Sequence, residues 1–138
     1  MKVLITGKNG QVGSCLVSQL IDIPSIDFLA LGREELDITN AEQVNEVVNK
    51  YQPTIIINAA AYTAVDKAES EFGLANAINN VGPKNLAKAA SNVNAAILHI
   101  STDYVFAGDK GGLYTEGDEV NPQGVYGKTK LAGEQSVA

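Results

Sequence analysis

The sequence predicts an α/β fold of the Rossmann type, a doubly wound parallel sheet. Short apolar runs rich in β-branched residues alternate along the chain with segments of helical periodicity, which is the pattern of successive right-handed βαβ units. A run with glycine at every third position, Gly7-Lys8-Asn9-Gly10-Gln11-Val12-Gly13, stands between the first apolar run and the first helical segment. With 138 residues, 45% of them hydrophobic, the chain can form about one domain with a real core.

Local patterns place the elements of the first half. Residues 2–6 are expected to form a buried strand, and a helix follows the glycine run through Leu16, Val17, Leu20 and Ile21. Residues 27–33 are expected to form a second strand, and residues 54–58 a third whose unbroken apolar character indicates burial on both faces. Between them, residues 39–42 (Thr-Asn-Ala-Glu) match a capping box that opens a helix with an apolar stripe of Val44, Val47 and Val48.

The second half continues the alternation. We expect a polar helix over residues 66–80, a further helix that opens at Pro83, a fourth strand over 96–101 and a final helix from Val125. His99 is expected to be a hydrogen-bonded core histidine, and Cys15 a small core residue of the first helix. The glycine-rich loop 106–122 is expected to be mobile.

The glycine run has the context of a phosphate-binding loop, since it joins a strand to a helix. Gly7 would allow a tight turn, Gly10 would let a pyrophosphate approach N–H groups at the helix N-terminus, and Gly13 would let the helix approach the strand. The spacing differs from the common Gly-x-Gly-x-x-Gly, and no lysine followed by Ser or Thr ends the run, which excludes a nucleoside-triphosphate P-loop. We therefore predict dinucleotide binding, against the alternative of an ordinary flexible turn.

The end of the second strand bears on which dinucleotide binds. An acidic residue normally stands there and binds the ribose 2′-hydroxyl of NAD, but this chain has Gly32-Arg33. An arginine can bind a 2′-phosphate bidentately, which favours NADP, while Glu34 and Glu35 weaken that inference. The choice between NADPH and NADH is left open.

A second set of residues indicates proton transfer. Tyr126 and Lys130 are four residues apart, so they share one face of a helix, and the hydroxyl residue Thr102 lies 24 positions before the tyrosine. A lysine ammonium beside a phenol stabilises the phenolate and lowers the tyrosine pKa from about 10, which makes Tyr126 a candidate general acid. Most such helical pairs only pack, so the prediction depends on the glycine run at the other end of the chain.

Composition excludes several partners. The net charge of −6 and the absence of a basic stripe argue against nucleic acid. No stretch matches a signal peptide or a membrane span, so we expect a cytoplasmic protein without a membrane partner. The residues specify no metal site.

These motifs resemble the extended short-chain dehydrogenase/reductase family, and within it the dTDP-4-dehydrorhamnose reductases. The matching stretches are residues 6–13, 58–69, 101–106 and 126–134, with a tyrosine at position 62 where the family often has histidine. The resemblance implies NAD(P)H-dependent reduction of the 4-keto group of dTDP-4-dehydro-L-rhamnose to dTDP-L-rhamnose, a polysaccharide precursor. It also implies a homodimer and Mg²⁺.

The resemblance assigns roles residue by residue. It makes Thr102, Tyr126 and Lys130 catalytic, and it places Thr102 and Asp103 against the sugar nucleotide. Tyr126 and Lys130 would also contact the cofactor, together with Gly10, Gln11, Val12, Asp37, Ile38, Ala61, Tyr62 and Thr63.

Family members run to about twice this length. We therefore expect residues 1–138 to form a truncated NAD(P)-binding domain without the substrate-binding lobe, inactive by itself, with the sheet incomplete at its C-terminal side and the fourth strand an exposed edge. Two alternatives stay open. One is a nucleotide-sugar epimerase or dehydratase with tightly bound NAD; the other is a non-catalytic regulatory subunit that binds a dinucleotide.

Overall fold

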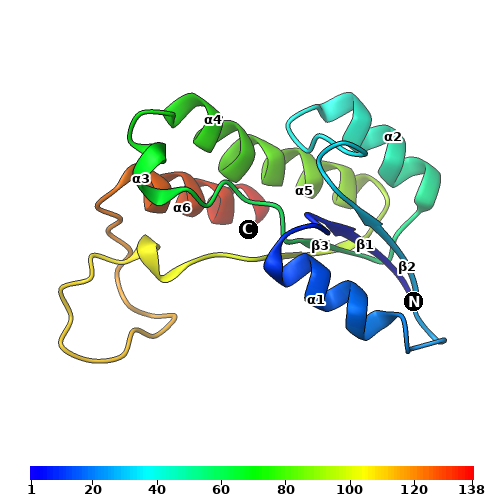
Figure 1. Cartoon of the computed structure of the whole chain (residues 1–138), viewed down its shortest axis with the longest axis horizontal. Helices are drawn as coiled ribbons and strands as arrows, with labels where there is room; N and C mark the ends of the chain where they lie inside the picture. Colours follow the sequence, from blue (N-terminus) through cyan, green and yellow to red (C-terminus); the bar gives the residue numbers. More distant parts are fainter.

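The computed structural model describes all 138 residues and shows a four-stranded parallel sheet in the order β2-β1-β3-β4 (Figure 1). The strands are β1 (Lys2–Thr6), β2 (Asp27–Leu31), β3 (Ile55–Asn58) and β4 (Ala96–His99). Thr6 pairs with both Leu31 and Asn58, and Asn58 pairs with His99, so all four strands end at one level. The predicted Rossmann-like fold is confirmed, and β4 is an edge strand as expected.

Helices lie on both sides of this sheet, which is the doubly wound arrangement. Figure 1 shows α1 (Gln11–Leu20) on one side, and α2 (Ala41–Tyr51), α4 (Phe72–Asn76), α5 (Gly82–Asn92) and α6 (Val125–Val137) on the other. The main core fills the space between the sheet and α2 and α5, with Leu4, Ile56, Val44, Val48 and Leu86 fully buried. Burial of these large aliphatic side chains is the main force that holds the layers together.

The other face of the sheet is covered only in part. Val3 and Ile5 of β1 are buried, but Ile55 and Ile57 of β3 are half-buried and Leu98 of β4 is 45% exposed. The prediction that the third strand is buried on both faces is therefore wrong for one face. The cause is that α1, the only helix on that side, contacts β2 and leaves β3 and β4 uncovered.

Cys15 is exposed, so the prediction of a core position is wrong. It lies on the face of α1 opposite the buried Gly13 and the half-buried Leu16, Val17 and Leu20. Its sulfur accepts a hydrogen bond from the Gln19 side chain at 3.3 Å.

The single polar helix predicted over residues 66–80 is wrong. The chain forms α3 (Val65–Ala68), a break, and then one helical run through α4, a π-helical turn η1 (Ala77–Val81) and α5. Pro83 accounts for the π turn, because proline has no N–H to donate to the Asn79 carbonyl and its ring would clash with that oxygen in a regular α-helix. The wider turn, in which the Gly82 N–H reaches back to Ala77, relieves the clash.

Smaller differences concern element ends. The second and fourth strands end at Leu31 and His99, two residues before the predicted ends. Asn40, not Thr39, caps α2, because its Oδ1 atom accepts from the N–H groups of Glu42 and Gln43.

The loop after the 3₁₀ turn η2 (Asp103–Val105) holds itself together by local contacts that the sequence did not suggest. Phe106 stacks on Tyr114 with ring centroids 4.5 Å apart, and Lys110 forms an ion pair with Asp118 at 2.7 Å. None of the helices combines the length and the apolar character that a membrane-spanning segment requires.

Candidate functional site

The glycine run forms a tight wedge at the carboxyl end of β1. Gly7 has a φ of 77°, and a Cβ there would lie 2.5 Å from the Ala60 backbone nitrogen. A Cβ on Gly13 would lie 2.1 Å from the Gly7 carbonyl oxygen. Both positions therefore require glycine, the first for its backbone conformation and both for close approach of main chains.

The helix that follows opens toward this wedge. Gly10 is the N-cap of α1 and offers no side chain to the helix end. The N–H groups of Gln11, Val12 and Gly13 donate to no acceptor in the protein, whereas the next one, of Ser14, bonds to the Gly10 carbonyl. Free N–H groups at a helix N-terminus attract an anion, so the loop fits the pyrophosphate of a dinucleotide.

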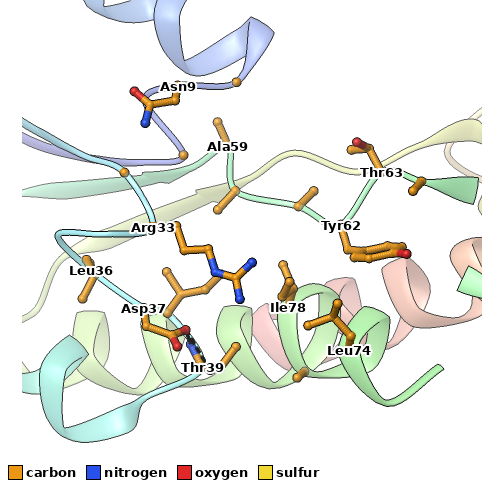
Figure 2. Close-up of a pocket in the computed structure, with 18 residues that line it drawn as sticks. Asn9, Arg33, Leu36, Asp37, Thr39, Ala59, Tyr62, Thr63, Leu74 and Ile78 are labelled. Carbon is orange, nitrogen blue, oxygen red and sulfur yellow. Dashed lines mark hydrogen bonds between the residues drawn. The ribbon is translucent and has the colours of Figure 1, made fainter. Parts of the chain in front are cut away.

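A cavity of about 430 Å³ lies beside the loop, at the carboxyl ends of β1, β2 and β3 (Figure 2). The sheet order reverses between β1 and β3, and ligands of open α/β sheets bind at such a point. Eight residues that the sequence analysis assigned to the cofactor line this cavity: Gly7, Gly10, Arg33, Asp37, Ile38, Ala61, Tyr62 and Thr63. The structure does not bring Gln11, Val12, Gly13, Tyr126 or Lys130 to its wall.

Other lining residues escaped the sequence analysis. Asn9 lies within the glycine run and Gly32 beside Arg33, so their neighbours could have indicated them. Leu74, Ala77 and Ile78 come from the helical run whose register the sequence did not predict, and no local signal marks them. Together these side chains give the cavity a largely apolar wall suited to a flat ring.

Charged groups gather where β2 ends. Arg33 forms no ion pair within the protein, and its guanidinium projects into the cavity in Figure 2. The Asp37 carboxylate accepts hydrogen bonds from Thr39, at 2.7 Å from the side chain and 2.9 Å from the N–H, and these bonds lower the pKa of Asp37. The Arg33 cation adds a smaller lowering effect.

Lys8 and Glu35 form an ion pair beside Arg33. The Lys8 ammonium lies 2.7 and 2.6 Å from the two carboxylate oxygens, and one of these oxygens also accepts the Gly32 N–H at 2.8 Å. The hydrogen bond from Lys8, and then that from Gly32, lower the pKa of Glu35. The pair thus joins the glycine loop to the turn after β2.

The predicted catalytic residues lie around a second cavity, also of about 430 Å³, which Tyr126 and Asp103 help to line. The Tyr126 ring packs edge-on against Tyr104, with centroids 5.5 Å apart. Thr102 is not among the lining residues; its hydroxyl donates to the Asp103 carboxylate at 3.2 Å and accepts from the Tyr104 N–H. No hydrogen bond joins Thr102, Tyr126 and Lys130 to one another.

Lys130 lies on the same helix as Tyr126, as predicted, and is only 2% exposed. Its ammonium donates to the Ile100 carbonyl at 2.5 Å and so ties α6 to the segment after β4. Burial lowers the pKa of Lys130, and the nearby Glu134 carboxylate opposes that shift. Two glycines let α6 pack this closely, since a Cβ on Gly127 or Gly133 would collide with a backbone oxygen.

A buried amide connects the two cavities. Asn79, fully buried in the π turn, accepts the Tyr62 N–H at 2.8 Å and donates to the Tyr62 carbonyl at 3.1 Å. The same side-chain nitrogen donates to the Thr129 hydroxyl at 3.2 Å. Tyr62 belongs to the first cavity and Thr129 to the helix that holds Tyr126 and Lys130, so Asn79 fixes their relative positions.

A second polar chain runs across the strand ends. The Thr6 hydroxyl donates to the side-chain oxygen Oδ1 of Asn58 at 2.6 Å, and the Asn58 side-chain nitrogen donates to Nδ1 of His99 at 3.0 Å. Nε2 of His99 is buried without a partner, so this histidine is only half satisfied, in contrast to the prediction. Burial, with a smaller effect of the Lys130 charge, lowers the pKa of His99 to about 4, so the ring is neutral at pH 7.

Comparison with known proteins identifies the family. A profile described as "RmlD substrate binding domain" matches residues 1–138. The chain belongs to the RmlD family. A "dTDP-4-dehydrorhamnose reductase" from Aggregatibacter actinomycetemcomitans is 49% identical over 134 residues, which are 97% of this chain and 46% of that protein. The resemblance inferred from the motifs is confirmed.

Two crystal structures of RmlD-type reductases show how far the likeness extends. The dTDP-4-dehydrorhamnose reductase of Clostridium acetobutylicum superposes with a TM-score of 0.97 at 52% identity, over 99% of this chain and 49% of that one. The Bacillus anthracis reductase, in complex with NADP, gives a TM-score of 0.95 at 46% identity, over 99% and 48%. The chain spans about half the length of the curated relatives it matches, and its sheet is homologous to the N-terminal half of RmlD proteins.

The chain contains no group of three or more His, Cys, Asp or Glu side chains that could hold a metal ion. The Mg²⁺ that the resemblance implied is not supported by these residues.

Proposed function

We propose that the protein reduces the 4-keto group of dTDP-4-dehydro-L-rhamnose to give dTDP-L-rhamnose, with NADPH or NADH as the reductant. The main support is the pairing of a glycine-built anion site with an adjoining cavity in a chain 46% identical to a reductase that binds NADP. We also propose that residues 1–138 form the NAD(P)-binding domain.

The first cavity would hold the dinucleotide. The free N–H groups at the start of α1 would bind the pyrophosphate, and Arg33 would face the adenosine ribose. Asp37 and Ile38 would border the adenine, while Ala61, Tyr62 and Thr63 would follow the cofactor toward the second cavity. The bound cofactor supplies the hydride.

The second cavity would hold the sugar, next to Asp103 and Tyr126. The Tyr126 hydroxyl would give its proton to the ketone oxygen, so that a hydride at carbon and a proton at oxygen complete the alcohol. The Thr102 hydroxyl would donate to the same oxygen, which requires it to leave its present acceptor, Asp103. Lys130 would hold α6 against the strand end and place positive charge near the phenol.

Replacement of Tyr126 by phenylalanine tests the proton donor. We expect Tyr126→Phe in the complete enzyme to lower kcat by at least about a hundredfold, because general acid catalysis typically contributes that much, and to keep NADPH affinity within about twofold. Tyr114→Phe is the matched control, since Tyr114 lies in the outer loop, stacked on Phe106. Near-normal kcat in Tyr126→Phe, measured with NADPH and the 4-keto sugar nucleotide, would disprove the role.

The implied homodimer is part of the same proposal. Light scattering after size-exclusion chromatography measures the mass directly, and a monomer across the micromolar range would exclude the dimer.

A further inference from the structure

Lys8 and Glu35 lie beside the first cavity, each next in sequence to residues of its wall. Lys8 and Arg33 supply two positive charges, but the first is neutralised within the protein by Glu35. Glu35 is anchored at the same time by the Gly32 N–H, so its carboxylate is held beside the backbone that precedes Arg33. The turn after β2 therefore holds an anchored carboxylate, paired with Lys8, beside Arg33, which has no ion-pair partner.

We propose that the Lys8–Glu35 ion pair sets the ratio of NADPH to NADH affinity, with Glu35 opposing the 2′-phosphate and Lys8 favouring it. This inference rests on the proposed function, because it requires a dinucleotide in the first cavity with its adenosine ribose at the Gly32–Arg33 turn. A phosphate monoester at this position carries about −1.5 to −2 charges at pH 7. The Glu35 carboxylate repels that charge, whereas the 2′-hydroxyl of NADH can donate a hydrogen bond to a carboxylate.

The geometry makes the two partners act in opposite directions. Lys8 extends from the glycine loop and reaches both Glu35 oxygens, so a 2′-phosphate near Arg33 would compete with Glu35 for the same ammonium. An ion pair that merely stabilised the loop would behave differently, since loss of either partner would break it with the same result. The sign of the two effects therefore separates a discriminating role from a structural one.

The experiment is isothermal titration calorimetry of the chain with NADPH and with NADH at low salt. In Glu35→Gln the amide oxygen can still accept the Gly32 N–H, so the turn is retained. We expect this variant to raise the affinity for NADPH relative to NADH by roughly threefold or more, and Lys8→Gln to lower it by a similar factor. The shifts should shrink at 0.5 M salt, because charges at the rim are screened.

Glu34→Gln is the matched control. It removes the same charge one residue away, at an exposed side chain that forms no ion pair or hydrogen bond. The inference is overturned if Glu35→Gln and Glu34→Gln change the affinity ratio equally, or if Glu35→Gln and Lys8→Gln change it in the same direction. If the unmodified chain binds neither dinucleotide, the proposed function fails and this inference fails with it.

Discussion

The fit of the glycine loop leads to a sharp prediction for Gly13→Ala. The added Cβ would lie 2.1 Å from the Gly7 carbonyl oxygen, 2.8 Å from its carbon and 2.9 Å from the Lys8 Cα, all backbone atoms. Ordinary contacts are about 3.5 Å, so main chain has to move by roughly 1 Å. Gly7 has little room to shift, because the Ala60 nitrogen lies only 2.5 Å from where a Gly7 Cβ would stand. We therefore expect a loss of about 3 kcal/mol or more in the free energy of unfolding.

Two other glycines provide the controls. A Cβ on Gly10 would meet only the Gly7 oxygen, at 3.4 Å, so Gly10→Ala should keep stability within about 1 kcal/mol while weakening NADPH binding about tenfold or more. A Cβ on Gly73 of α4 meets nothing, and alanine there should stabilise by about 0.5–1 kcal/mol. Urea unfolding monitored by far-UV circular dichroism measures the stability of the three variants, and a titration measures the NADPH affinity of Gly10→Ala. A Gly13→Ala chain as stable as Gly10→Ala would refute the packing argument.

Three further predictions follow from side-chain contacts. Asn79→Ala leaves the Tyr62 N–H and carbonyl without their partner and removes one bond of the Thr129 hydroxyl, so it should cost about 2–4 kcal/mol in urea unfolding. Asn80→Ala, whose amide bonds only to other side chains, should cost about 1 kcal/mol. Equal losses would contradict the linking role of Asn79. Asn40→Ala should cost about 1 kcal/mol through loss of the α2 cap, and no change in the urea midpoint would show that the cap is not needed. The pKa of His99 falls from 6.5 to about 4 on folding, so the unfolded chain binds the proton first and stability should drop as pH falls from 6.5 to 4. After allowance for the exposed part of the ring, the loss is about 1–2 kcal/mol. In His99→Gln the free energy of unfolding should fall less steeply between pH 6.5 and 4. An unchanged slope would show that other groups cause the loss of stability.

The elements that sequence could predict are those fixed by local rules. Four apolar runs became four parallel strands, and the glycine run became a loop between β1 and α1, because both patterns depend on neighbours within a few residues. The Tyr126–Lys130 spacing likewise placed both residues on α6. Eight predicted cofactor residues line one cavity since strand ends and their loops meet at the same sheet edge.

The features that escaped prediction depend on contacts distant in sequence. Asn79 bonds to Thr129, 50 positions away, and the Val125 N–H bonds to Glu69, 56 positions away. No local sequence pattern around Asn79 or Glu69 indicates that each bonds to a residue of α6.

The π turn shows how one local rule generates such a distant connection. Pro83 denies the Asn79 carbonyl its helical donor, and the widened turn presents that oxygen to α6, where Gly133 leaves room for it. The same turn points the Asn79 side chain back to Tyr62 and onward to Thr129. A regular helix would advance the side chain by a different angle per residue and could not keep both contacts. The π turn therefore links the first cavity, through Asn79, to the helix that holds Tyr126 and Lys130.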